Sequence, residues 1–184
     1  MTSNYNMLTD KIIQFNDVFE DMNKVVTQVN SGSWEHWGRA NNERIGSLRW
    51  IYNNEDYLYK AINEAVAKSV KEYFSNQSIL EDKYSFSNSS YHIRKWDSPM
   101  RGMEPHSDFS ANGDGSRSNP SYTICGYITD DYEGGHLEFP NHNISFKPPA
   151  GSIIIFPSDE WHGVSYVISG NRMMFSLFIH ELTQ

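Results

Sequence analysis

Two stretches in the first half of the chain repeat their apolar residues with the period of a helix. Residues 8–18 are expected to form a short strand that leads into the first helix, at 19–30. Apolar residues recur at every third or fourth position of each helix. They are Phe19, Met22, Val25, Val26 and Val29 in the first, and Leu58, Ile62, Ala65, Val66, Val70, Tyr73 and Phe74 in the second, at 55–75. Ser31, Gly32 and Ser33 separate the two helices.

From about Lys83 the pattern changes to short apolar runs separated by turn residues, which is typical of strands. The expected strands are Tyr91–Trp96, Ser121–Thr129, His136–Phe139, Ile144–Lys147, Ser152–Phe156, Gly163–Ile168 and Arg172–Glu181. Strands at this spacing predict a sandwich or a jelly roll. We therefore expect an α+β chain that is mainly β. Residues 1–184 would form one domain, with 1–82 as a helical support layer and 83–184 as the β core.

Three segments between these strands predict loops or turns. Residues 109–120 form a long polar, glycine-containing loop directly after Asp108. Gly134-Gly135 and Ser169-Gly170-Asn171 are expected to form tight hairpin turns.

Composition and charge narrow the classes of function. Aromatic residues make up 14% of the chain, which disfavours disorder. The net charge of −8 disfavours a nonspecific nucleic-acid binder, whose affinity comes from phosphate contacts. The longest apolar run is far shorter than the roughly 18 residues that cross a bilayer, so we expect no membrane partner. The polar segment Met1–Asp10 does not resemble a signal peptide, and Cys125 is the single cysteine, so a cytoplasmic location is expected.

The segment His106-Ser107-Asp108 is the first candidate for chemistry. In a strand, residues i and i+2 point to the same face, so an imidazole and a carboxylate would project together. A second imidazole would complete a two-histidine, one-carboxylate facial triad, which leaves metal positions open. His162 is the best candidate because it follows the buried run Ser152–Phe156 and precedes the expected strand Gly163–Ile168. His136 is a competing candidate, which its expected position in a hairpin disfavours.

The last expected strand brings a cation to the same region. Arg172, Met174, Ser176, Phe178 and His180 share one face, and the residues between them are apolar. A buried guanidinium needs a partner. That partner is either a carboxylate of the protein or a dicarboxylate cosubstrate, which a guanidinium binds through two parallel hydrogen bonds.

Four segments, in order, resemble the Fe(II)/2-oxoglutarate oxygenase superfamily, and specifically its prolyl 4-hydroxylase-like branch. They are EPHSD at 104–108, TICGYITDDYEGGHLEF at 123–139, PPAGSIIIFPSDEWHGV at 148–164 and SGNRMMFSLFI at 169–179. The resemblance covers roughly Lys83 to Glu181. It implies a double-stranded β-helix, or jelly roll, supported by the N-terminal helices. It also implies a 2-oxoglutarate-dependent dioxygenase that hydroxylates a C–H bond and releases succinate and carbon dioxide.

The resemblance assigns roles residue by residue. His106, Asp108 and His162 would bind Fe(II). Arg172 would hold the distal carboxylate of 2-oxoglutarate, assisted by Ser176 and Tyr127. The implied cofactors are Fe(II), 2-oxoglutarate and dioxygen, with ascorbate as a further candidate. The segment 112–115 resembles a loop that helps form the substrate entrance in oxygen-sensing prolyl hydroxylases.

The expected substrate is a prolyl residue in a peptide or protein. Two alternatives stay open, namely a hydroxylase of a free amino acid or other small molecule, and a non-enzymatic, cupin-like metal-binding module. The chain has Lys95-Trp96 and Met103 where the family often has Arg-Tyr and a further Tyr, which affects the substrate class rather than the metal. Nucleic-acid demethylation is disfavoured, because that branch has a second arginine where Phe178 stands here.

Overall fold

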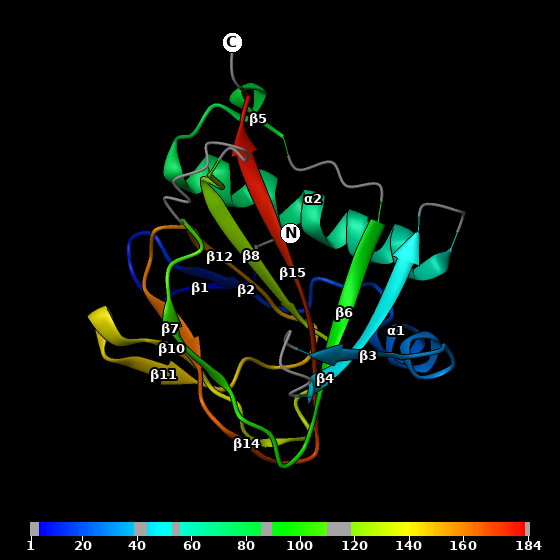
Figure 1. Ribbon diagram of the computed structural model, residues 1–184. Helices are drawn as coiled ribbons and strands as arrows, with labels where there is room; N and C mark the ends of the chain where they lie inside the picture. Colours follow the sequence, from blue (N-terminus) through cyan, green and yellow to red (C-terminus); the bar gives the residue numbers. More distant parts are fainter. Residues whose placement is uncertain (1–3, 39–43, 53–55, 86–89, 110–118, 183–184) are drawn as a thin grey trace.

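The computed structural model describes residues 4–38, 44–52, 56–85, 90–109 and 119–182. Its strands form a nine-stranded main sheet, a four-stranded second sheet and a two-stranded ribbon. The main sheet has the order β1-β2-β12-β8-β15-β6-β4-β3, with β5 paired to β15 (Figure 1). The second sheet has the order β11-β10-β13-β7, and β14 pairs with β9.

The main sheet draws on the whole chain. Its strands are β1 (Tyr5–Met7), β2 (Ile13–Phe15), β3 (Glu35–Gly38), β4 (Arg44–Tyr52), β5 (Tyr84–Ser85), β6 (Ser90–Asp97), β8 (Tyr122–Tyr127), β12 (Ile153–Pro157) and β15 (Asn171–Glu181). The other strands are β7 (Met103–His106), β9 (Glu133–Gly134), β10 (Leu137–Phe139), β11 (Ile144–Phe146), β13 (His162–Val164) and β14 (Val167–Ser169). Single 3-10 turns lie at Glu81–Lys83 and Pro140–His142.

Both predicted helices are present, and both start at a capping carboxylate. Helix α1 (Met22–Asn30) follows Asp21, whose side chain accepts a hydrogen bond from the Lys24 amide. Helix α2 (Tyr57–Gln77) follows Asp56, which accepts from the Leu58 amide. These bonds satisfy amides that have no partner inside the helix. Helix α2 ends at Ser78, which has a left-handed conformation.

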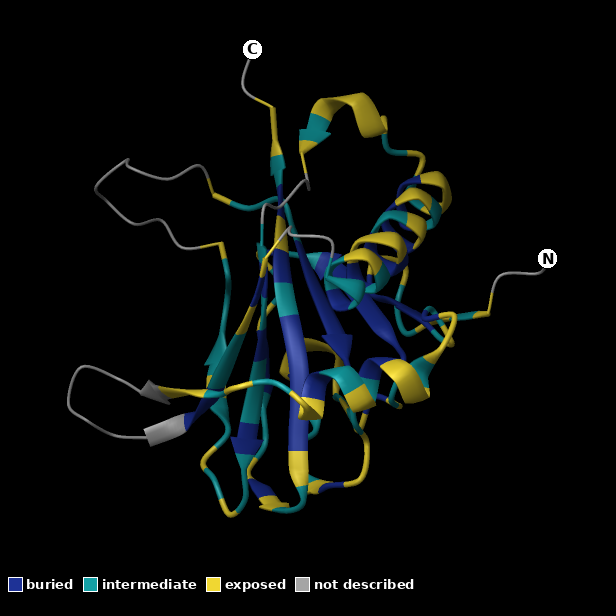
Figure 2. Cartoon of the chain, turned by 90° about the vertical axis from the view of Figure 1, so that its right-hand side faces the viewer, coloured by how far each residue is buried: buried dark blue, intermediate teal, exposed yellow. Residues whose placement is uncertain are grey.

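Both faces of the central strands of the main sheet are buried, so this part of the molecule has three layers. Alternate side chains of β12 separate into two cores: Ile153 and Ile155 pack with the helices, whereas Ile154 and Phe156 pack toward the second sheet. In β15, Phe175 faces the helices and Met174 the second sheet. The strands are largely dark blue in Figure 2, and the helices carry exposed residues on their outer faces. The mainly β, jelly-roll prediction is confirmed, because antiparallel strands form two sheets with a buried core between them.

Several sequence-based expectations need correction. Residues 1–82 are more than a helical support layer, because β1, β2, β3 and β4 from this part join the main sheet. The predicted strand at 163–168 is divided into β13 and β14, which belong to different sheets. The assignment of all 184 residues to one domain stays a prediction.

The two predicted hairpin turns have the expected glycine conformations but do not join paired strands. Gly134, Gly135 and Gly170 have positive φ angles of 69°, 60° and 77°. The strands on either side of each turn pair with other strands, so these turns carry the chain from one sheet to another. No helix in the described ranges combines the length and the apolar character that a bilayer crossing requires.

Candidate functional site

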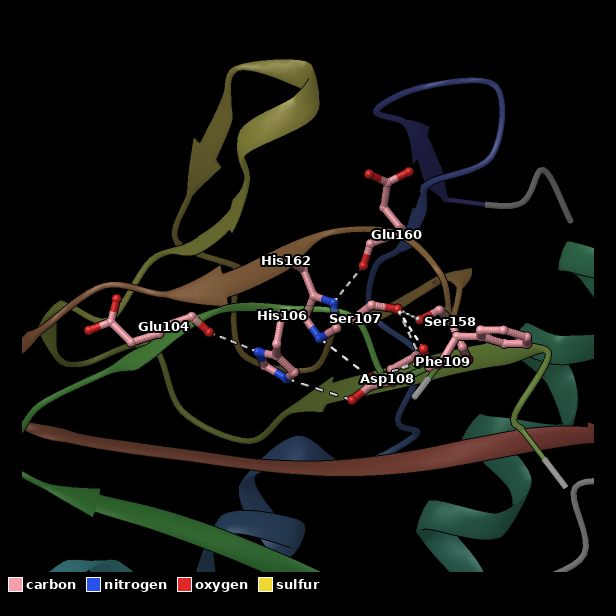
Figure 3. A network of polar contacts seen from close by, with 9 residues as sticks. Glu104, His106, Ser107, Asp108, Phe109, Ser158, Glu160 and His162 are labelled. Atoms are coloured by element: carbon pink, nitrogen blue, oxygen red, sulfur yellow. Dashed lines mark hydrogen bonds and ion pairs between the residues drawn. The ribbon is translucent and has the colours of Figure 1, made fainter. Parts of the chain in front are cut away.

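The second sheet brings the two candidate histidines together. His106 is the last residue of β7, His162 is the first of β13, and the two are direct partners in the antiparallel pairing. Asp108 follows two residues after His106, just beyond the strand (Figure 3). One ligand atom from each of His106, Asp108 and His162 lies within 4.8 Å of the others. The structure therefore gathers the three residues that the sequence nominated, although Asp108 lies outside the strand.

Hydrogen bonds from the rings orient the two imidazoles. His106 Nδ1 lies 2.9 Å from the Glu104 carbonyl oxygen, and His162 Nδ1 lies 2.9 Å from that of Glu160. A carbonyl oxygen only accepts, so each Nδ1 carries the proton and donates. The Nε2 atoms then face Asp108, at 3.6 Å from Oδ1 for His106 and 3.4 Å from Oδ2 for His162. Both Nε2 lone pairs point to one spot, as metal ligands do.

Asp108 is held by the main sheet. The Thr123 hydroxyl on β8 donates to Asp108 Oδ2 at 2.9 Å, and the buried Ser158 hydroxyl lies 2.9 Å from Thr123 Oγ1. The Phe109 amide donates to the Ser158 carbonyl oxygen at 2.8 Å. These contacts fix the carboxylate on the cavity side of β8.

The electrostatics of the cluster keep the carboxylate charged. Burial by itself raises the pKa of Asp108, but its contacts with His106, His162 and the Thr123 hydroxyl outweigh burial and hold that pKa below its ordinary value. Contact with Asp108 raises the pKa of His106, because the carboxylate stabilises the protonated ring, and burial lowers the pKa of His162. One carboxylate and two imidazoles with converging nitrogens form the donor set of a mononuclear Fe(II) site with open positions. The residues present fit such an ion.

A cavity of about 250 Å³ extends from this cluster between the two sheets. Its walls include all six residues that the sequence nominated, which are His106, Asp108, His162, Arg172, Ser176 and Tyr127. Ser176 pairs across the sheet with Cys125, and Phe178 pairs with Thr123, the partner of Asp108. Arg172 and the metal cluster thus lie at opposite ends of the cavity, with Ser176 between them.

Arg172 is completely buried. Its Nε donates to the Gly135 carbonyl oxygen and its Nη2 to the Tyr127 hydroxyl, both at 3.1 Å. Its guanidinium carbon lies 4.6 Å from the centre of the Trp96 ring. Its Nη1 has no hydrogen-bond partner, and no carboxylate pairs with it, within the described ranges. A buried cation with a free N–H at a cavity wall is a receptor for an anion.

Sequence reasoning missed Thr123 and Arg94, which also line the cavity. The two-residue period of a strand would have found both. Thr123 shares a face of β8 with Tyr127, and Arg94 shares a face of β6 with Trp96. Burial lowers the pKa of Arg94, while the charge of Asp108 opposes that shift. Arg94 therefore adds positive charge to the cavity.

The other nominated residues lie apart from the cluster. His136 Nδ1 lies 3.4 Å from the Ser145 hydroxyl, and His136 is not part of the His106, Asp108 and His162 group. Trp161 is exposed, whereas Trp96 and Met103 line the cavity. Most of the predicted 109–120 loop, including 112–115, lies outside the described residues.

The family model of the 2OG-Fe(II) oxygenase superfamily matches residues 91–180, which include every nominated site residue. Among curated proteins, a PKHD-type hydroxylase of Crocosphaera subtropica is 37% identical over 68 residues, which is 36% of this chain and 31% of that protein. The chain thus spans about a third of the length of the curated relatives that it matches first.

Solved structures share the whole fold at low sequence identity. The viral collagen prolyl hydroxylase of Paramecium Bursaria Chlorella virus-1, in complex with 2OG, has a TM-score of 0.68 at 17% identity and covers 99% of this chain and 98% of that one. A Trichoplax adhaerens prolyl hydroxylase, in complex with a hypoxia inducible factor peptide fragment, has a TM-score of 0.66 at 19% identity and covers 94% and 84%. These likenesses show the fold. The family model, over residues 91–180, identifies this part of the chain as similar to the 2OG-Fe(II) oxygenase superfamily, in agreement with the family that the sequence predicted.

Proposed function

We propose that this chain is an Fe(II)- and 2-oxoglutarate-dependent dioxygenase that hydroxylates a prolyl residue in a peptide or protein. The observation that carries the proposal is the pairing of two features in one cavity. A two-histidine, one-carboxylate cluster lies at one end, and the buried Arg172, with an unused N–H, lies at the other. A module that only binds metal has no need of the second feature, which disfavours the cupin-like alternative.

Each nominated residue has a defined part in this proposal. The Nε2 atoms of His106 and His162 and one Asp108 oxygen would hold the iron. Arg172 would bind the distal carboxylate of 2-oxoglutarate through Nη1, while Tyr127 and Gly135 keep the guanidinium in place. Ser176, which lies between the two ends of the cavity, would assist Arg172 in holding the cosubstrate. Arg94 contributes a second positive charge, which favours a dianionic cosubstrate.

When bound, iron and 2-oxoglutarate would supply the oxidising chemistry of the family together with dioxygen, which provides one oxygen atom to succinate and one to the hydroxylated C–H bond as carbon dioxide is released. The protein positions the groups and limits water. Leu137, Met103 and Val164 form an apolar wall beside the ligand cluster. A dry wall strengthens the charge interactions of Arg172 and Asp108, because the local dielectric constant is low.

The prolyl substrate draws its support from the relatives. The curated matches are PKHD-type hydroxylases and a putative prolyl 4-hydroxylase, and one solved neighbour is a prolyl hydroxylase in complex with a peptide fragment. Lys95, Trp96 and Met103 stand where the family often has Arg, Tyr and a further Tyr, which affects the substrate class. The identity of the substrate is therefore tested separately from the cofactor site.

The decisive experiment is an anaerobic titration of the Fe(II)-loaded protein with 2-oxoglutarate, followed by the visible metal-to-ligand charge-transfer band. We expect a saturable band that requires about 100-fold more 2-oxoglutarate in Arg172→Ala, because a buried, hydrogen-bonded charge is lost. Arg101→Ala, which removes an exposed arginine side chain, is the matched control. Iron binding without any band would refute the oxygenase proposal and favour the metal-binding module.

A further inference from the structure

The cavity face of the main sheet continues beyond the cavity as an exposed aromatic surface. Strand β4 lies next to β6 in the sheet (Figure 1), and Trp50 is the direct partner of His92. The Trp50 ring lies 5.2 Å from the His92 ring and stacks on Tyr52 at 6.3 Å, with 19° between the planes. We call Trp50, Tyr52 and His92 the aromatic shelf.

The alternation of β4 and β6 fixes which way the shelf faces. Ile51 and Ile93 belong to the core under the helices, and the Arg49 guanidinium donates to carbonyl oxygens of α1. Trp50 and His92 therefore point to the opposite side. On β6, His92 shares its face with Arg94 and Trp96, which line the cavity. The shelf and the cavity thus form one continuous surface.

Two rings of the aromatic shelf are exposed to solvent. Trp50 is 41% exposed and Tyr52 is 57% exposed, although both are large rings on a sheet. Phe178, at the wall of the cavity, is 37% exposed. Clustered exposed aromatic rings mark binding surfaces far more often than isolated apolar residues do.

We propose that the aromatic shelf binds the flanking part of an extended, proline-containing polypeptide whose reacting residue occupies the cavity. This inference rests on the proposed function and adds to it a second, non-catalytic contact for the substrate. Flat aromatic rings accept proline rings, and a proline-rich segment is already extended, so little conformational entropy is lost on binding. The net charge of −8 disfavours a nucleic acid as the occupant of the same rings.

The spacing of the strands sets the reach of the substrate. Two interstrand steps separate β15 from β4, which is about 10 Å. An extended proline-rich chain rises about 3.1 Å per residue, so about three residues cover that distance. A peptide with fewer flanking residues on either side of the reacting proline would miss the shelf.

The test compares two end-blocked, fluorescently labelled peptides that share one central proline. The long one has about 12 residues with further prolines, and the short one about 3 residues. Binding is measured by fluorescence anisotropy, and turnover by succinate release from the Fe(II)-loaded protein. The variants are Trp50→Ala/Tyr52→Ala, Trp50→Phe as the conservative change, and Tyr166→Ala as an equally exposed tyrosine away from the shelf.

For the long peptide, we expect the double variant to raise Kd and KM about tenfold with kcat unchanged. Trp50→Phe and Tyr166→Ala should keep wild-type values, and the short peptide should not distinguish the variants. Equal affinity of the wild type and the double variant for the long peptide would overturn the inference, as would no binding of that peptide. Shelf-dependent binding of a single-stranded oligonucleotide instead would also overturn it. Shelf-dependent peptide binding without succinate release would keep the shelf and reject the proposed hydroxylase.

Discussion

At the scale of single residues, the candidate ligands depend on neighbours that never touch the metal position. Asp108 takes its orientation from Thr123, and each imidazole takes its orientation from a backbone carbonyl oxygen. Such outer contacts fix ligand geometry and strengthen metal binding. The Thr123 hydroxyl is therefore a positioning group whose removal leaves all three ligands in place.

We predict that Thr123→Val weakens Mn(II) or Fe(II) binding by about 10- to 100-fold, because Asp108 loses its donor. The measurement is a metal titration by calorimetry under anaerobic conditions. Thr129→Val is the matched control, since the Thr129 hydroxyl bonds only to the backbone of Asn171 and Met173. Equal metal affinity in Thr123→Val and the wild type would contradict the assigned role.

A second residue-scale prediction concerns pH. Burial, helped by Arg94, lowers the pKa of His92 to about 4, from about 6.5 in the unfolded chain. Between these values the unfolded state binds more protons than the folded state. The free energy of unfolding therefore falls as pH drops from about 6.5 to about 4.

His92→Phe and His92→Gln should each lose this part of the pH dependence. The expected difference from the wild type is on the order of 1 kcal/mol between pH 7 and 4.5, discounted for partial exposure. Urea unfolding at the two pH values measures it. If both variants keep the wild-type dependence, proton uptake by another group is responsible.

At the scale of elements, helix α2 supports the sheet that positions the site. Its buried face includes Leu58, Ile62, Val66 and Val70, which pack against the main sheet. The start of the helix depends on the Asp56 side chain, at 2.8 Å from the Leu58 amide. This one cap satisfies a donor that the helix itself leaves free.

We predict that Asp56→Ala lowers the free energy of unfolding by about 1 kcal/mol. Asp56→Asn keeps an acceptor oxygen and should lose only a small part of this stabilisation. Urea unfolding at neutral pH distinguishes the two variants. Identical stability of Asp56→Ala and the wild type would show that the cap contributes nothing.

At the scale of the whole molecule, the site lies on one face of the main sheet and the larger core on the other. That core joins the helices to residues such as Ile153 and Phe175 and includes none of the candidate ligands. We therefore expect the fold not to depend on a metal, in contrast to small domains that fold around one.

Metal and cosubstrate should stabilise an already folded chain by binding to it. We predict that Mn(II) and 2-oxoglutarate, each at about 100 times its Kd, raise Tm by about 10–20 °C together. A chelator should reverse the shift and leave a cooperative transition. Asp108→Ala should fold and show no shift. Unfolding on chelation would contradict a metal-independent core.

The fold was predicted correctly from the sequence where buried side chains recur with the regular spacing of a helix or a strand. The alternation in β15 identified the residues facing each layer, and the helical spacing identified α2 to within two residues at either end. The prediction failed for β3 and β4, which pair with each other, because they lack a strong local pattern. The prediction also failed at residues 163–168, because the single apolar run there forms strands in two different sheets.

The sequence by itself determined the chemical types of the candidate site, namely two imidazoles, one carboxylate and one guanidinium. Only the tertiary structure decided that His106 and His162 are direct partners, that Thr123 holds Asp108, and that Arg172 has a free N–H in the same cavity. The aromatic shelf was also identified only from the tertiary structure. A strand records in its own sequence which side chains face inward, but neighbouring strands and their register are set by packing between distant segments.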